Sequence, residues 1–208
     1  PPAPAKPAAE QVWRVPIHDT DPTLGPDSAP IKVVIMSAFG CSECSTFAAD
    51  AKRLFDEPTY KGKIQYRFKH KILPPQHPDS IIAGEASMAA NAQGKFWPYH
   101  DKLMANAFAV GRSDLERYAK ELGLNMGKFK RALDKHTYKG ILARDSVIAN
   151  ETGSHSFPNI LANGIRIKKP KNYDNLKKLI DSQIERVKEL KAAGATDDNL
   201  YERSISGG

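Results

Sequence analysis

Two cysteines, Cys41 and Cys44, stand two residues apart, where an apolar run ends and a helical pattern begins. A pair at this spacing can close a small disulfide across the first turn of a helix. The first sulfur then lies beside unpaired helix N–H groups, whose partial positive charge favours a thiolate over a thiol. The pattern therefore predicts that Cys41 is the attacking sulfur. Cys44, one turn further in, would resolve a mixed disulfide formed on Cys41.

From the residues alone, the same pair could also hold zinc or form a purely structural disulfide. Tetrahedral zinc usually takes two such pairs, or one pair with two closely spaced histidines. The chain has two cysteines in all. The candidate histidines are His70 and His77, but their spacing is too loose for a zinc finger. We therefore expect no metal and no bound cofactor, and we assign redox chemistry to the pair.

The composition is that of one sizeable domain with a basic surface. The chain has 208 residues and a formal net charge of +7, and two cysteines cannot staple a domain of this length. The lysines are scattered rather than gathered in one block, which predicts a solvated surface and no nucleic-acid partner. Residues 1–10 form a Pro/Ala-rich tether. No apolar stretch approaches the ~20 residues of a membrane span, so we expect no membrane insertion of this segment.

The elements that position the cysteines can be predicted in order. Residues 11–17 alternate large apolar side chains and predict a short edge strand. Residues 31–36 are an unbroken apolar and β-branched run, as in a strand covered on both faces, and 42–55 have helical spacing. Residues 63–69 alternate again, and the intervening helix allows this strand to lie parallel to the first by a right-handed crossover.

The second half predicts helices and then a return to the sheet. Residues 78–150 repeat apolar side chains at helical spacing, with a capping box at 113–116 and a cap at Asn125. Asn163-Gly164 is a strong hairpin signal between 159 and 167. An amphipathic helix is predicted over 173–190. Residues 191–208 read as a loosely docked tail or a linker. The predicted domains are therefore 11–77 with 151–190, interrupted by a helical insertion at 78–150.

This order resembles the thioredoxin fold with a helical insertion, as found in the DsbA-like thiol-disulfide oxidoreductases of bacterial envelopes. The motifs that carry the resemblance are residues 39–44 (FGCSEC), 93–103 (QGKFWPYHDKL) and 157–160 (FPNI) before Asn163-Gly164. The resemblance implies an α/β fold in which helices flank a central mixed sheet. It also implies a cis Pro158 that faces the disulfide, and backbone that holds a client polypeptide in an extended form. The substrate-binding residues would be Phe39, Ser42, Phe157 and Pro158.

The chain departs from the family pattern at three positions. Ser42-Glu43 replaces the Pro-His that oxidising members often carry, and an acid there opposes a thiolate on Cys41. Ile35 stands where the family frequently has a buried acid, so that Glu43 or water would have to handle the proton of Cys44. Phe157 is bulkier than the usual residue before the cis proline. We therefore include Glu43 among the catalytic residues and expect a milder oxidant than the strong periplasmic oxidases.

The sequence thus predicts a protein thiol-disulfide oxidoreductase that exchanges disulfides with cysteines of client proteins and is recycled by a redox partner protein. The alternatives are a reductase or isomerase of the same fold, and a non-catalytic module that binds peptides or acts as a chaperone. We expect a monomer in the periplasm or another extracytoplasmic compartment, with the N-terminal segment available as a tether.

Overall fold

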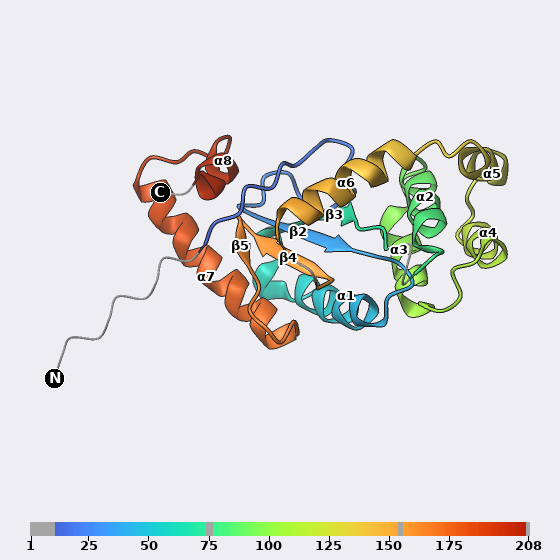
Figure 1. The fold of residues 1–208 in the computed structure, drawn as a ribbon. Coiled ribbons are helices and arrows are strands. Elements are labelled where there is room, and N and C mark those ends of the chain that lie inside the picture. Colours follow the sequence, from blue (N-terminus) through green and yellow to red (C-terminus); the bar gives the residue numbers. More distant parts are fainter. Residues whose placement is uncertain (1–10, 74–76, 154–155, 207–208) are drawn as a thin grey trace.

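A computed structural model describes residues 11–73, 77–153 and 156–206, so the predicted tether lies outside the described residues. At its centre is a mixed five-stranded sheet in the order β1-β3-β2-β4-β5, with helices on both faces (Figure 1). The α/β thioredoxin-like class predicted from the sequence is confirmed. The strands are β1 (Thr23–Leu24), β2 (Ile31–Ser37), β3 (Ile64–His70), β4 (Asn159–Ala162) and β5 (Ile165–Arg166). The helices are α1 (Ser42–Phe55), η1 (Pro58–Tyr60), α2 (Ser80–Asn91), α3 (Phe96–Ala105), α4 (Arg112–Glu121), α5 (Met126–Asp134), α6 (Lys139–Glu151), α7 (Tyr173–Ala192) and α8 (Leu200–Ile205).

The central strand β2 pairs in parallel with β3, from Ile31 opposite Ile64 to Ser37 opposite His70. The crossover through α1 makes this pairing possible, because parallel neighbours cannot be joined by a tight turn. On its other side β2 pairs antiparallel with β4. Its carboxyl end therefore lies in the middle of the sheet, between two neighbours, and the chain leaves it directly toward the two cysteines.

Alternate side chains of β2 enter two different cores, as the two-residue period of a strand requires. Val33 and Ile35 pack with residues of α1 and α7, whereas Val34 and Met36 pack with Ile148 of α6. In Figure 1 α1 and α7 lie on one side of the sheet and α6 on the other. The strand is covered on both faces, as its unbroken apolar sequence predicts.

Helices α2 to α5 form a block at the end of the molecule beyond the carboxyl ends of β2 and β3 (Figure 1). Their buried side chains share one core with Phe39 and Phe68 at the end of the sheet. Asn125 caps α5 as predicted, with its side chain accepting the N–H of Lys128 at 3.0 Å. The predicted capping box at 113–116 is wrong, because α4 already begins at Arg112, and its N-cap Gly111 has no side chain to accept a hydrogen bond.

The predicted edge strand over residues 11–17 is also wrong. In this segment Val12 forms only an isolated bridge to Ile165, and β1 takes the edge beside β3 instead. Pro16 has no N–H to give to a ladder. Trp13 packs under the guanidinium of Arg166, 4.3 Å from the ring centre to Cζ. The segment therefore crosses the end of the β4–β5 hairpin rather than extending the sheet.

The hairpin itself turns on Asn163 and Gly164 as predicted. Both have positive φ, +46° and +83°, which matches the tight turn that suits the twist of paired strands. Any side chain at Gly164 would meet the carbonyl oxygen of Trp13, because a Cβ there would lie 2.9 Å from it.

The C-terminal residues do not form the loose tail that the sequence suggested. Helix α8 packs against α7, and Leu200 and Ile205 are buried. The Tyr201 hydroxyl donates to the carbonyl oxygen of Val15 at 2.7 Å. Three apolar or aromatic residues on one side of this short helix therefore dock it. Among the residues that the structure describes, no helix is both long and apolar enough to cross a membrane.

Candidate active site

The two cysteines lie where β2 gives way to α1. Gly40 adopts a positive φ of +81°, a conformation that glycine takes without steric cost. This turn makes Cys41 the N-cap of α1, and its Sγ accepts the backbone N–H of Cys44 at 3.3 Å. The sulfur thus takes the place of the oxygen in an ordinary serine cap. Both residues are free cysteines, with Cys41 8% exposed and Cys44 1% exposed.

The pKa values of the two thiols are driven apart. The Cys44 thiol donates to Cys41 and is the main reason that the pKa of Cys41 falls to about 7, and N–H groups of the first turn lower it further against the opposing effect of burial. The same hydrogen bond and burial raise the pKa of Cys44. One sulfur is therefore available as a thiolate near neutral pH, and the other holds its proton.

The charge of Glu43 acts in the predicted direction but is a minor cause. It raises the pKa of Cys41, yet it ranks behind the Cys44 hydrogen bonds and burial. The backbone N–H of Glu43 lowers the same pKa. The side chain is exposed to solvent, where charges are screened. Glu43 thus lies beside the reactive sulfur, and its assignment as a catalytic residue stays a prediction.

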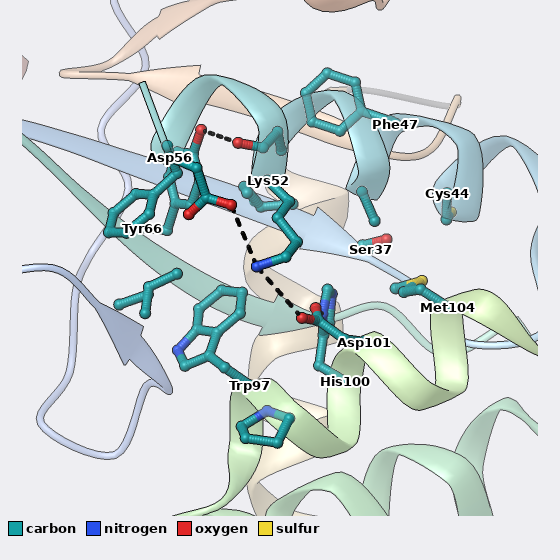
Figure 2. A pocket seen from close by; sticks show the side chains of 16 residues that line it. Ser37, Cys44, Phe47, Lys52, Asp56, Tyr66, Trp97, His100, Asp101 and Met104 are labelled. Atoms are coloured by element: carbon teal, nitrogen blue, oxygen red, sulfur yellow. Dashed lines mark hydrogen bonds and ion pairs between the residues drawn. The ribbon is translucent and has the colours of Figure 1, made fainter. Parts of the chain in front are cut away.

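A cavity of about 440 Å³ opens between α1 and α3, and Cys44 is part of its wall. Figure 2 shows Cys44, Ser37 and Met104 grouped at one end of this cavity, with Lys52, Asp56 and Asp101 further along. Lys52 lies 3.4 Å from Asp56 and 3.8 Å from Asp101. The hydroxyl of Ser37 also hydrogen bonds with the Cys44 sulfur. Ile35 contributes an apolar wall where the family frequently has an acid.

A second cavity, of about 670 Å³, lies on the other side of the cysteine motif. Three segments form it: the first turns of α1, the loop before β4, and the loop between β5 and α7. Its lining residues are Glu43, Thr46, Ser156, Pro158, Lys169, Pro170 and Lys171. The Phe157–Pro158 peptide bond is cis, as predicted. Pro158 therefore shares a cavity with Glu43, two residues from Cys41. Direct contact of Pro158 with Cys41 stays a prediction.

The other predicted substrate-binding residues have different surroundings. Phe39 is only 2% exposed and stacks on Phe68, with 5.6 Å between ring centres. Its assignment to a substrate surface is wrong, because the ring fills the core between the sheet and the insertion. Ser42 is exposed in the first turn of α1. Phe157 is half-buried, with the ammonium of Lys71 5.3 Å from its ring centre.

Lys169 and Lys171 were missed from the sequence. The run KKPK at 168–171 follows the predicted hairpin, but a basic loop reads as solvated surface. The Lys171 ammonium donates to the carbonyl oxygen of Ser156 at 2.9 Å and to its hydroxyl at 3.0 Å. Burial and the charge of Lys169 lower the pKa of Lys171, and the charges of Glu43 and Cys44 act to raise it.

The histidines weighed as zinc ligands have other roles in the fold. His70 hydrogen bonds through Nδ1 to Asp145 at 3.3 Å and through Nε2 to Ser87 at 2.9 Å. His77 lines a small hollow beside Gly40. His155, a loop histidine near Pro158, lies outside the described residues. Within the described ranges, no three histidine, cysteine or acidic side chains are grouped so that they could hold a metal.

Comparison with known proteins agrees with this geometry. The family model described as thioredoxin matches residues 18–182. The chain belongs to the thioredoxin family. It is 30% identical to the probable disulfide bond formation protein D of Bacillus cereus, over 81% of both proteins. The structure of BdbD from Bacillus subtilis superposes with a TM-score of 0.74 at 25% identity, over 85% of this chain and 99% of that one. Together these matches relate the chain to the Bacillus disulfide bond formation proteins.

A further group of similar proteins is much longer. The chain is 30% identical to the Na(+)/H(+) antiporter NhaA 3 of Salinispora tropica over 88% of its own length, but it spans only 28% of that protein. The chain therefore corresponds to about a quarter of such a relative. The structure of α-DsbA1 from Wolbachia pipientis, with a TM-score of 0.68, is 18% identical over 92% of this chain and 95% of that one. That likeness shows the fold alone.

Proposed function

We propose that the protein exchanges disulfides with cysteines of client proteins through Cys41 and Cys44. The observation that supports this function is the difference in pKa between the two thiols. Cys41 has a pKa of about 7, whereas Cys44 is buried and has a raised pKa. A purely structural disulfide requires no such difference in pKa between its two cysteines. A structural zinc site takes four ligands, and no three histidine, cysteine or acidic side chains among the described residues are grouped to supply them.

In the oxidising direction a client thiolate attacks the Sγ of Cys41 in the Cys41–Cys44 disulfide. A bond forms between the client sulfur and Cys41, the bond to Cys44 breaks, and Cys44 leaves with the electron pair. Its raised pKa means that it takes up a proton. A second client thiolate then attacks the client sulfur of the mixed disulfide and expels Cys41 as a thiolate. Two electrons have passed from the client to the pair, and a redox partner protein must remove them.

The pKa of Cys41 supports a mild redox potential. Strongly oxidising members of the fold have attacking cysteines with a pKa of ~3.5, whereas the value in thioredoxin is ~7. A less stabilised thiolate gives a less stabilised reduced form. We therefore propose a reduction potential of roughly −180 to −270 mV rather than about −120 mV. In this range a role as reductase or isomerase is the second candidate function, and the pKa of Cys41 is the observation that favours it.

We also propose an extracytoplasmic location, supported by the similarity to the Bacillus disulfide bond formation proteins, with residues 1–10 as a tether. The clients are proteins with pairs of cysteines, and the functional unit is a monomer. These assignments depend on relatives of similar length, whereas the antiporter-type relatives extend far beyond this segment.

The test is Cys41→Ser in an assay of disulfide formation in a reduced dithiol peptide, with circular dichroism to verify the fold. We expect the rate to fall to that of the uncatalysed reaction, a loss on the order of a thousandfold, because the nucleophile and leaving group is gone. If Cys41→Ser leaves the effect on a client unchanged, the protein is a binding or chaperone-like module and the exchange function is wrong.

A further inference from the structure

The cavity beside Pro158 has one wall made of lysines. Lys169 and Lys171 come from the loop between β5 and α7, and Glu43 and Thr46 come from α1. Lys169 is exposed and forms no ion pair with any residue that the structure describes. A cation in this position is free to meet a charge that arrives from outside. The cavity reaches Glu43, two residues from the attacking sulfur.

Lys171 is held in place rather than free in solvent. It is half-buried, and its ammonium donates both to the carbonyl oxygen and to the hydroxyl of Ser156. An ammonium has three N–H donors, and the described residues supply acceptors for two. The third can be given to a ligand in the cavity. Fixing a long lysine side chain in advance also reduces the entropy that an incoming anion would have to remove.

The balance of charge in this cavity is positive. The lining carries two lysines against one carboxylate, Glu43, and Arg166 is near enough to act on the pKa of Lys171. Glu43 repels an anion, and its charge acts on Lys171 more strongly than that of Arg166, but its side chain is exposed to solvent, where charges are screened. A client held in extended form beside Pro158 advances ~3.3 Å per residue. A side chain one to three residues from its cysteine therefore has the reach to enter this cavity.

We propose that Lys169 and Lys171 form a subsite for an acidic side chain close to the reactive cysteine of the client. The preferred substrates are thus segments in which aspartate or glutamate lies within about three residues of the cysteine. This inference rests on the proposed function, because it names the class of client that the exchange reaction selects. The recognition is electrostatic, so it weakens as ionic strength rises.

The experiment uses three dithiol peptides of equal length, in which the residues flanking the cysteines are aspartate, asparagine or lysine. Each peptide is mixed with stoichiometric oxidised protein, and the initial rate of peptide disulfide formation is measured. Flanking charges change the reactivity of the peptide thiols themselves. Each rate is therefore divided by the rate of the same peptide with 2-hydroxyethyl disulfide, a small neutral oxidant. The readout is the ratio of corrected rates, acidic over neutral peptide.

For the wild-type protein at low salt we expect a ratio of about three to ten, the effect of one or two partly exposed ion pairs. The ratio should fall to about one in the double variant Lys169→Gln and Lys171→Gln, and below one in Lys169→Glu with Lys171→Glu. Glu43→Gln should raise it. Lys61→Gln is the matched control, because Lys61 is an exposed lysine before β3, which lies on the other side of β2 from the β4–β5 hairpin, and it should keep the wild-type ratio.

A wild-type ratio of one or less overturns the subsite, as does a ratio that the double variant leaves unchanged. If the double variant fails to fold, the two single variants replace it, and each should lower the ratio. The proposed function is judged separately by the neutral peptide. Failure of the wild-type protein to oxidise any of the three peptides would overturn the exchange function itself, whereas oxidation without discrimination would overturn only the acidic subsite.

Discussion

Two buried polar groups lie near the carboxyl ends of β2 and β3, and they have opposite characters. One is the Cys41–Cys44 pair. The other is the cluster of Ser87, His70 and Asp145, linked by hydrogen bonds of 2.9 and 3.3 Å. The second cluster has the side chains and the order of a hydrolytic triad, yet the three residues are at most 2% exposed.

The two groups differ in how many of their polar atoms have hydrogen-bond partners within the protein. The Ser87 hydroxyl donates to the carbonyl oxygen of Gly84 at 2.7 Å. Asp145 also accepts the backbone N–H of His70 and the guanidinium of Arg144. The polar atoms of this cluster thus form hydrogen bonds that hold α2 and α6 against β3. The cysteine pair instead has one sulfur of lowered pKa, and Cys44 lines an open cavity. Residue types alone do not show whether a group is reactive. Reactivity also requires that a substrate can reach the group and that its polar atoms are not all engaged in hydrogen bonds within the protein.

The largest expected effect in this comparison is on stability. Burial alone would raise the pKa of Asp145, but the hydrogen bonds from His70 and Arg144 outweigh it and lower the pKa. Asp145→Ala leaves His70 without its acceptor and removes one of the two carboxylates that Arg144 contacts, Asp21 being the other. We therefore expect a loss of about 3 kcal/mol in the free energy of unfolding. Denaturant unfolding measures this, with Ser87→Ala as the milder case at about 1 kcal/mol.

The same cluster predicts a pH dependence with a definite sign. The folded pKa of Asp145 is lowered, so its stabilising contribution is fully present above its unfolded value of ~3.9. The contribution is lost as the pH falls through the folded pKa. Wild-type protein and Asp145→Ala should therefore converge in stability at low pH. If Asp145→Ala instead removes thiol exchange without loss of stability, the assignment of a structural role to the Ser87–His70–Asp145 cluster is wrong.

A smaller effect is expected from removing the resolving cysteine. Cys44 provides the largest contribution that lowers the pKa of Cys41. Cys44→Ala should therefore raise that pKa by about one unit, equivalent to ~1.4 kcal/mol. It should also trap mixed disulfides with clients, because no second thiol remains to release them. Non-reducing electrophoresis detects the trapped complexes, and titration of Cys41 reports the pKa. An unchanged pKa would show that the helix N–H groups alone stabilise the thiolate.

The smallest effect is expected at Glu43. Its carboxylate is exposed and ranks fourth among the causes that act on Cys41. Glu43→Gln should therefore lower the pKa of Cys41 by only a few tenths of a unit, about the size of an exposed charge interaction. The effect should shrink further in high salt. A fall of more than one unit in the pKa of Cys41 would mean that the charge of Glu43, rather than the hydrogen bond from Cys44, is the main influence on the redox potential.

The sequence predicted most of the elements around the site because their signals are local. The apolar run of β2, the helical spacing of α1 and the Asn163-Gly164 turn each depend on a few neighbouring residues. The failures have tertiary causes. Phe39 is core because the insertion covers the end of the sheet. Residues 11–17 form only the Val12–Ile165 bridge, and Trp13 packs on Arg166 instead of continuing a strand. Lys171 is positioned in the site by a hydrogen bond to the carbonyl oxygen of Ser156, fifteen residues earlier in the chain. No local sequence pattern could reveal this contact.

The central claim is that Cys41 alone is the reactive thiolate near neutral pH. It is tested most directly by labelling the reduced protein with iodoacetamide across a pH series and locating the label by mass spectrometry. The account predicts that the label is found on Cys41, with a rate that rises through a midpoint near pH 7, while Cys44 stays unmodified. Dominant labelling of Cys44, or a midpoint for Cys41 near its ordinary value of 9, would contradict it.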